Sequence, residues 1–435
     1  MAFLPHAERS ISFPFGGKLR DPSLSQKSNP TPWGMCESEG MANPVPISLP
    51  MRALLAGARR KQAELVDFTR TLVRAESPSE NKAAVDQCMS LAADRAQSLG
   101  GRVRRHRQRL FGDVVELRFG SPKATTRSLL LGHLDTVWPL GTLRTMPCRV
   151  VDGRLHGPGT LDMKVGVAMA LSAVEMLIES ECLKQGGSHE IIFLLNSEEE
   201  IGSPVSRPIT EALARECTSV YVLEPAQGLA LKTSRKGTGN WRMEVTGRAA
   251  HSGVDFTEGR SAVRELARLI EQVSEWTNLE RGVTVNVGVV GGGSKTNVIP
   301  AEAWAEVDVR IARRADGPRM ERRFCALKPT HLGKDCSLAI SGGINRPPME
   351  RSRGGVRLFR RAQSLAAQLD WNLAEAATGG ASDGNFTAAL GIPTLDGLGA
   401  VGQGAHAAHE HVLIDSIAPR TALLAGLLVG EIDRS

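Results

Sequence analysis

The 435-residue sequence predicts an α/β protein with a mostly parallel sheet covered by helices, together with a smaller inserted α+β unit of ferredoxin-like order. Two observations predict this fold. Short continuous apolar segments alternate with helical stretches along most of the chain, which is typical of strands that helices bury on both faces. Between residues 235 and 346 the pattern changes to strand, helix, two strands, helix and strand.

Residues 1–50 differ in composition from the rest of the chain. They hold eight of the 23 prolines and many Ser and Gly residues. They lack the apolar segment of 7 to 15 residues that defines a secretory signal peptide. We therefore predict a disordered N-terminal extension, with Met35, Met41 or Met51 as alternative translation starts.

Regular structure is expected from Met51 onward, beginning with a long periodic helix. A second helix is expected to start at a capping box of Ser77 and Glu80, with Pro78 at its first position, and to stop at Gly100–Gly101. A later helix is expected at 162–180. Four continuous apolar segments predict strands of the main sheet, at residues 128–132, 190–196, 219–223 and 392–398.

Two domains are expected to follow from this order. A larger, discontinuous domain comprises residues 51–234 and 347–435, and the inserted domain comprises residues 235–346. The strand after the insertion, IPTLDGL, returns to the sheet of the larger domain. A Gly-rich stretch at 288–296 superficially resembles a phosphate loop, but it joins two strands and does not open a helix, so we interpret it as a connection.

Composition excludes several functional classes. The chain has 53 Lys and Arg against 47 Asp and Glu, and the basic segment 101–109 alternates as a solvated edge strand does. Apolar residues make up 41% of the chain, and none of its segments approaches the roughly 18 apolar residues that span a bilayer. The seven cysteines are scattered, without a CxxC pair. We expect a soluble, cytoplasmic protein with reduced thiols that binds neither nucleic acid nor membranes.

Acidic and histidine side chains follow several of the predicted strands. Each has an ordinary interpretation: a polar loop contact for His133, an N-cap for Asp162, and a solvated charge run for the glutamates at 198–200. Ligands of open α/β sheets, however, bind outside the carboxyl ends of the strands. The shared position of these acidic and histidine side chains at the strand ends favours a functional site. The candidate members of this site are His133, Asp135, Asp162, Glu198, Glu199, Glu200, Glu224, His406, His409 and His411.

Imidazole and carboxylate ligands without thiolate fit zinc, with cobalt or manganese as alternatives. Two metal ions would need about five protein ligands, one of them bridging. Asp135 is the natural partner for the second ring nitrogen of His133, because ligating imidazoles commonly donate that N–H to a carboxylate. The C-terminal histidines do not form HExxH, which excludes the zinc site that is built on one helix.

The motifs GHLDTVWPLG, GPGTLDMKVG, NSEEEIGS, LEP, GRAAHSG and GQGAHAAHEHV occur in this order. The sequence resembles the di-zinc carboxypeptidase and deacylase family over about residues 55–430. That family includes glutamate carboxypeptidase, acetylornithine deacetylase, succinyl-diaminopimelate desuccinylase and aminoacylase, and the glutamate carboxypeptidase branch is the most similar. The resemblance implies a zinc-peptidase fold, two zinc ions per subunit, and a homodimer formed through residues 235–346 as a dimerisation and lid domain.

The resemblance also implies a role for each site residue. One zinc would be held by His133, Asp162 and Glu224, and the other by Asp162, Glu200 and His406, with Asp162 bridging. Asp135 would orient His133, Glu199 would be the general base, Glu198 would lie outside the site, and His251 would reach the partner subunit's site. Substrate contacts would come from Asn297, Arg310, Arg346 and the Gly379–Gly380 loop, while His409 stands where Asp or Asn is common and adds an imidazole near the metals.

The implied reaction is amide hydrolysis. A hydroxide bridging two zinc ions would attack the carbonyl, with Glu199 taking and returning the proton. The first hypothesis is a carboxypeptidase that releases a C-terminal acidic amino acid, and the alternative is an N-acyl amino acid deacylase of the acetylornithine deacetylase type. A hypothesis of another class is a catalytically silent dimer that binds amino-acid-like ligands. Metal analysis separates the hydrolases from the silent dimer.

Overall fold

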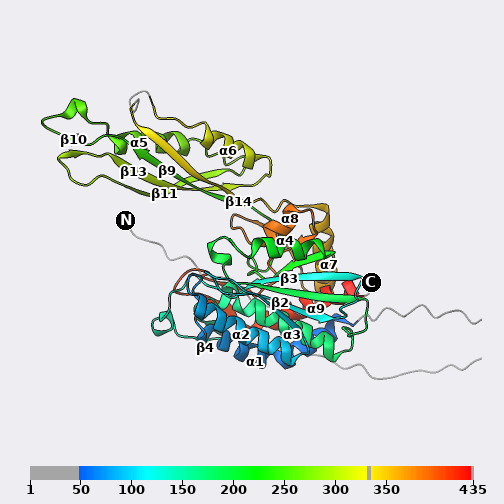
Figure 1. Ribbon diagram of the computed structural model, residues 1–435. Coiled ribbons are helices and arrows are strands. Elements are labelled where there is room, and N and C mark those ends of the chain that lie inside the picture. The colour runs from blue at the N-terminus through cyan, green and yellow to red at the C-terminus, as the bar shows by residue number, and fades with distance from the viewer. Residues whose placement is uncertain (1–48, 331–334, 433–435) are drawn as a thin grey trace, which may run out of the picture.

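The computed structural model describes residues 49–330 and 335–432 (Figure 1). The predicted N-terminal extension lies, up to residue 48, outside the described residues. The described chain forms a larger lobe around a six-stranded sheet and a smaller lobe around a four-stranded sheet.

The main sheet has the order β1-β2-β6-β3-β7-β16. Its strands are β1 (Arg102–His106), β2 (Val114–Gly120), β3 (Thr126–His133), β6 (His189–Asn196), β7 (Ser219–Val222) and β16 (Thr394–Leu395). The four strands β6, β3, β7 and β16 are parallel to one another. At one edge β2 pairs antiparallel with β6, and β1 pairs antiparallel with β2. The predicted α/β class is confirmed. The predicted basic edge segment forms β1, where Arg102 pairs with Glu190 at 2.6 Å.

Apolar side chains of the central strands are buried on both faces of this sheet. Leu130 of β3 belongs to the core under one helical layer, whereas Leu129 and Leu131 belong to the core on the other face. Figure 1 shows α1 (Met51–Arg74), α2 (Lys82–Ser98), α3 (Val165–Glu179) and α9 (Ile417–Ile432) along one face. The other face carries α4 (Arg207–Arg215) and α8 (Gly384–Ala389), and α7 (Arg353–Ala367) contacts α9. Continuous apolar strands therefore reflect burial on two sides.

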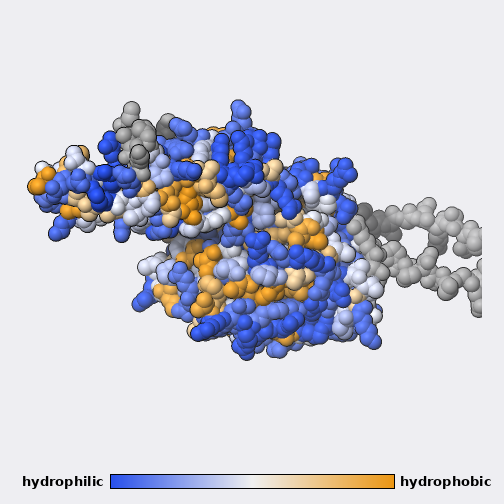
Figure 2. Space-filling view, turned by 45° about the horizontal axis from the view of Figure 1, so that its top comes forward, coloured by the Kyte–Doolittle hydropathy of each residue, from blue (hydrophilic) through white to orange (hydrophobic). Residues whose placement is uncertain are grey.

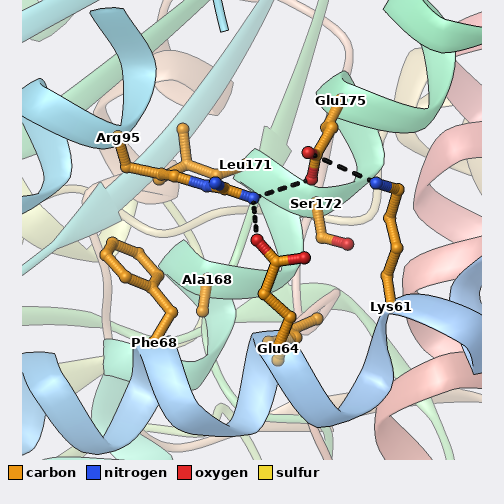
Figure 3. Close-up of a pocket in the computed structure, with 9 residues that line it drawn as sticks. Lys61, Glu64, Phe68, Arg95, Ala168, Leu171, Ser172 and Glu175 are labelled. Atoms are coloured by element: carbon orange, nitrogen blue, oxygen red, sulfur yellow. Dashed lines mark hydrogen bonds and ion pairs between the residues drawn. The ribbon is translucent and has the colours of Figure 1, made fainter. Parts of the chain in front are cut away.

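Ion pairs join three of the helices of the first layer. Arg95 of α2 lies 2.6 Å from Glu64 of α1 and 2.9 Å from Glu175 of α3, which also pairs with Lys61 at 3.2 Å (Figure 3). These side chains surround a cavity of about 20 Å³, whose lining contains none of the predicted site residues. We interpret this cluster as a structural contact between helices.

The predicted start of the second helix is wrong. The helix α2 begins at Lys82, and Asn81 is its N-cap, with Oδ1 accepting from the N–H of Ala84 at 3.1 Å. The hydroxyl of Ser77 instead donates to the carbonyl of Leu134 at 2.5 Å, beyond β3. Ser77, which the local pattern predicts as an N-cap, thus makes a tertiary hydrogen bond instead.

The inserted lobe has the element order that the sequence predicts. Its strands β9 (Gly237–Thr246), β11 (Thr284–Gly292), β13 (Glu302–Ile311) and β14 (Ser337–Arg346) form an antiparallel sheet of order β11-β13-β9-β14. The helices α5 (Ala262–Ser274) and α6 (Asp316–Cys325) supply apolar side chains to a core with one face of this sheet. The burial of β9 alternates residue by residue, as expected for a sheet with one covered and one open face.

Smaller strand pairs position the loops near the sheet edges. A second four-stranded sheet has the order β17-β18-β5-β4. Its members are β4 (Arg149–Val151), β5 (Arg154–His156), β17 (Gly402–Gln403) and β18 (His411–Leu413). Two further pairs are β8 (Leu231–Arg235) with β15 (Glu375–Thr378), and β10 (Ala250–His251) with β12 (Val298–Ile299).

The described cysteines are free thiols, at positions 88, 148, 182, 217, 325 and 336. Within the described ranges, the helices include none with the length and apolar content needed to cross a membrane.

Candidate metal centre

The predicted ligands meet at the carboxyl edge of the parallel strands. His133 ends β3, Glu199 and Glu200 follow β6, and Glu224 follows β7. His133 lies beside Asn196, the last residue of β6, in the strand register. Because these strands are parallel, the side chains after their ends reach the same space.

Asp162 lies at the centre of the cluster. Its Oδ1 is 3.2 Å from Nε2 of His133, and its Oδ2 is 3.5 Å from Nε2 of His406. Nε2 of His406 is 3.1 Å from Oε2 of Glu200, and Nε2 of His133 is 3.6 Å from Oε1 of Glu224. Asp162 therefore stands between two histidine and glutamate pairs, as a bridging ligand requires.

This donor set fits a pair of metal ions. Potential ligand atoms lie within 4.8 Å of one another in two groups, one of His133, Glu199 and Glu224 and the other of His133, Asp162 and Glu200. His406 adds its imidazole beside the second group. Buried carboxylates in such number repel one another unless cations compensate them. Nitrogen and carboxylate donors without thiolate fit zinc, cobalt or manganese.

The tautomer of His133 follows from its hydrogen bond. Nδ1 donates to the backbone carbonyl of Asp135 at 3.1 Å, which leaves Nε2 free to face Asp162 and Glu224. The carboxylate of Asp135 also accepts from the backbone N–H groups of Glu199 at 3.1 Å and Glu200 at 3.2 Å. Asp135 thus connects the loop after β3 to the loop after β6.

The charges of the cluster shift the pKa values of its members. Burial raises the pKa of Glu200 to about 7, although His406 opposes the shift. Hydrogen bonds to Asp162 and then Glu200 raise the pKa of His406 to about 10. Burial disfavours ionisation of Asp162, but His133 and His406 outweigh it and lower the pKa of that carboxyl. The cluster therefore attracts a positive charge between its carboxylates.

Glu199 is buried beside this cluster. Burial raises its pKa well above the usual range, and the guanidinium of Arg346 opposes the shift. Nη2 of Arg346 lies 2.9 Å from Oε1 of Glu199 and 2.9 Å from Oδ1 of Asp383. A buried carboxyl with a raised pKa is suited to accept and return a proton near neutral pH.

Two predicted substrate contacts have partners within the larger lobe. Arg346, predicted to meet a substrate carboxylate, is buried and contacts Glu199 and Asp383. The carbonyl of Gly380 accepts from Nη1 of Arg235 at 3.3 Å. Glu198, predicted to lie outside the site, accepts from the backbone N–H of Ser206 at 2.6 Å and is not a member of the two candidate ligand groups.

Three other predicted site residues lie in the inserted lobe. Nδ1 of His251 in β10 accepts from the N–H groups of Gly253 and Val254, each at 3.1 Å, so its Nε2 carries the proton. The carbonyl of Asn297 accepts from the N–H of Ser252 at 3.0 Å, and Nε of Arg310 pairs with Asp308 at 2.9 Å. Figure 1 shows β10 and β13 in the inserted lobe, apart from the sheet whose edge carries the metal cluster.

Sequence reasoning missed two buried supports of the cluster. Nε and Nη2 of Arg235 each donate to Asp396 at 2.7 Å, and Nη2 lies 3.2 Å from Oε2 of Glu224. Glu410 accepts from the backbone N–H groups of Gly159, Leu161 and Asp162 at 3.0, 2.8 and 3.1 Å. These contacts are hard to predict from the local sequence, because most of the partners are more than 150 positions apart in the chain. The pair of Arg235 and Glu224 is the exception.

The neighbouring His409 is exposed, and its backbone carbonyl accepts from Nδ1 of His411 at 2.9 Å. His406 has a φ of 61°, which is uncommon for a residue other than Gly.

A parallel α/β sheet with two groups of candidate metal ligands at its carboxyl edge, one of which includes a buried glutamate, is typical of a metal-dependent hydrolase. The model of peptidase family M20/M25/M40 matches residues 129–429, and the chain belongs to this family. The resemblance found in the motifs is thereby confirmed, and the protein is a metallopeptidase or deacylase.

Individual relatives cover most of the chain. Carboxypeptidase G2 of Pseudomonas sp. is 29% identical over 70% of this chain and 73% of its own length. Succinyl-diaminopimelate desuccinylase of Acinetobacter baumannii is 25% identical over 78% of this chain and 92% of its own. The crystal structure of the YXEP protein of Bacillus subtilis, described as a dinuclear metal-binding peptidase of the M20 family, has a TM-score of 0.61 at 13% identity. It covers 85% of this chain and 98% of its own.

Proposed function

We propose that the protein is a carboxypeptidase that releases a C-terminal acidic amino acid from a small peptide or N-acylated substrate. The observation that carries amide hydrolysis is the position of Glu199. Its carboxyl is buried and has a raised pKa. Together with His133 and Glu224 it forms one of the two candidate ligand groups, next to Asp162. This arrangement supports Glu199 as the proton acceptor for amide hydrolysis.

Two zinc ions are the proposed cofactor, with cobalt or manganese as alternatives. His133, Asp162 and Glu224 would hold one ion, and Asp162, Glu200 and His406 the other. Bound there, the ions would polarise the substrate carbonyl and lower the pKa of water. Glu199 would accept the proton of the attacking water and deliver it to the leaving amine, a transfer worth about 10²- to 10⁴-fold in rate.

The acidic amino acid is proposed from the resemblance of the motifs to the glutamate carboxypeptidase branch and from the available cations. Arg310 lies on the inserted sheet, paired with the partly exposed Asp308, and can exchange this partner for a substrate carboxylate. Asn297 is exposed near His251, next to β12. Arg346, the last residue of β14, and Gly380 of the larger lobe would support the carboxylate after a rearrangement of their present contacts.

A homodimer through the inserted lobe is also part of the proposal. β11 is an edge strand of its sheet, and Val289 and Val290 on it are 48% and 57% exposed. An exposed apolar edge strand is a template for pairing with another chain. In such a dimer, the Nε2–H of His251 from one subunit would donate to the substrate carbonyl in the other subunit's site.

A deacylase is the second candidate. The relative succinyl-diaminopimelate desuccinylase matches this chain over 92% of its own length, and the same metal centre serves either reaction. The two functions differ in which side of the amide is recognised.

The test combines metal analysis with hydrolysis of N-acyl amino acids and of peptides ending in glutamate or aspartate. We expect about two zinc ions per chain, loss of turnover on chelation and recovery on readdition. The Glu199→Gln variant should keep its zinc and lose at least about 100-fold in kcat. Full activity of this variant, or activity that survives complete metal removal, would overturn the proposal.

A further inference from the structure

A groove of about 580 Å³ opens beside the metal centre. Glu200, whose carboxylate lies 3.1 Å from His406, forms part of its wall. The groove is therefore continuous with the cluster, and its volume lies in the range of about 300–1,000 Å³ that is typical of small-ligand sites. Its lining residues are Pro78, Ser79, Glu80, Asn81, Thr136, Val137, Pro139, Leu140, Glu200 and Ile201.

The groove exposes large apolar side chains. Val137, Leu140 and Ile201 are 44%, 53% and 43% exposed, and all three belong to its wall. Contiguous exposed apolar residues usually mark a binding surface. Figure 2 shows that hydrophobic residues gather on the larger lobe on the side that faces the inserted lobe.

The loops that form the groove are held firmly. The N–H of Thr136 donates to the carbonyl of Ser77 at 2.8 Å, and the hydroxyl of Ser79 donates to Asp135 at 2.6 Å. The carboxylate of Glu76 accepts from the N–H groups of Gly141 and Leu143 at 2.7 and 2.8 Å, which anchors the loop carrying Leu140. A site of fixed shape can discriminate between groups of different size.

The charge of the lining selects the occupant. Its charged members are the carboxylates Glu80 and Glu200, and among the described residues the lining contains neither Lys nor Arg. The buried arginines near the cluster, Arg235 and Arg346, pair instead with Glu224 and Glu199. In the metal-loaded protein the charge of Glu200 would be compensated, and Glu80 remains as a carboxylate that repels an anionic group. An anionic group would also have no cationic side chain of the lining to pair with, whereas an uncharged apolar group can pack against Val137, Leu140 and Ile201.

Resting on the proposed function, we infer that this groove binds the acyl or peptidyl side of the substrate and selects an uncharged apolar or aromatic group. The amino acid that leaves carries a carboxylate and is excluded from the groove by its charge. Val137, Leu140 and Ile201 are the specificity-determining residues for the acyl side.

The first experiment measures binding of N-acetyl-, N-hexanoyl-, N-benzoyl- and N-succinyl-glutamate to the zinc-loaded Glu199→Gln protein by calorimetry. Hexanoyl and benzoyl compounds should bind at least about tenfold more tightly than acetyl, because they bury more apolar surface. Succinyl, which brings a carboxylate to the groove, should gain nothing over acetyl. Leu140→Ser and Ile201→Ser should each reduce the hexanoyl-to-acetyl ratio about fivefold. Leu279→Ser, at a leucine that is 76% exposed and outside the groove lining, is the matched control and should keep the ratio.

The same compounds are then tested as substrates of the wild-type protein. Size-dependent binding without hydrolysis of any compound would leave the groove assignment standing and overturn the proposed function. Hydrolysis of acetyl and hexanoyl compounds with equal kcat/KM would overturn the groove assignment alone. An equal loss on all compounds in Leu140→Ser would also overturn it. That result would indicate that the groove contacts another protein segment, such as the exposed Val254 and Phe256 of a second copy.

Discussion

Glu410 holds the backbone that carries Asp162. Its Oε1 accepts from the N–H groups of Leu161 and Asp162 at 2.8 and 3.1 Å, and its Oε2 accepts from Gly159 at 3.0 Å and from Nε1 of Trp138 at 3.0 Å. Both carboxylate oxygens are thus filled by donors, and the residue is 1% exposed. The central carboxylate of the candidate metal cluster is thus positioned by a residue from the C-terminal part of the chain.

Replacing Glu410 by Gln should weaken metal binding about 10- to 100-fold, because the new NH₂ group faces backbone N–H donors and displaces the loop of Asp162. Competition with a chromophoric chelator measures the zinc affinity. Glu280→Gln, at an exposed glutamate of the inserted lobe, should leave it unchanged. An unaltered zinc affinity in Glu410→Gln would contradict the positioning role.

Arg235 should prove essential for the stability of the metal-free protein. Arg235→Met leaves Asp396 without its bidentate partner and Glu224 without its cation, both in buried positions. Stranding a buried charge costs about 3–5 kcal/mol. Urea unfolding with a chelator present measures the free energy of unfolding. Arg351→Met removes a pair with Glu375 from the surface, where water screens the charges and the cost should be much smaller. Equal losses in the two variants would refute the prediction.

The strands of this protein, and the candidate ligands that the fold brings together, could be predicted because their signals are local. Residues 128–132 and 190–196 are continuous apolar segments, and both lie in buried parallel strands. His133 and Glu200 are recognisable as candidates because they follow such strands closely. The parallel arrangement then brings them together without further information.

The supports of the cluster could not be predicted in the same way. Arg235 and Asp396 are 161 positions apart, and a lone arginine in a strand has many ordinary explanations. The cap predicted at Ser77 is wrong because a capping box and a tertiary contact to Leu134 have the same local pattern. Long-range pairing, and not propensity, decides these positions.

His189 should make the protein sensitive to acid. Burial lowers its pKa from 6.5 to about 4, and its Nε2 has no hydrogen-bond partner among the described residues. Below pH 6.5 the His189 imidazole is protonated in the unfolded chain, whereas in the folded chain it stays neutral down to about pH 4. The stabilisation is therefore complete above pH 6.5, declines below it, and is lost once the pH falls through about 4. The loss attributable to this residue between pH 8 and pH 5 should be about 2 kcal/mol.

Urea unfolding of wild type and His189→Leu at pH 8 and pH 5 measures this contribution. Both proteins should be metal-free, so that protonation of the metal ligands does not enter the difference. The variant should lose about 2 kcal/mol less than the wild type on acidification. Identical pH dependence of the two proteins would show that His189 is not the sensitive group.

Arg346 should set the acid limit of activity. Its guanidinium opposes the rise in the pKa of Glu199, 2.9 Å away. In Arg346→Gln the carboxyl should stay protonated to higher pH, so the acid limb of kcat/KM should move upward by about one pH unit or more. Arg346→Lys should restore part of the shift, since it keeps the charge. A uniform loss at every pH, with the acid limb unmoved, would show that Arg346 does not control the pKa of Glu199.

Mixed dimers test whether His251 acts in the site of the other subunit. Glu199→Gln and His251→Ala should each be inactive alone. In a heterodimer of the two, one site combines both defects and the other has an intact Glu199 and an intact His251 from the opposite chain. Random mixing makes half of the dimers heterodimers, so about a quarter of wild-type activity should return. If His251 served its own chain, every site in the mixture would lack one of the two groups, and activity would stay at the level of the single variants. His251→Gln, which keeps a hydrogen-bond donor, should retain more activity than His251→Ala in the homodimer, because the Nε2–H is the group proposed to reach the carbonyl.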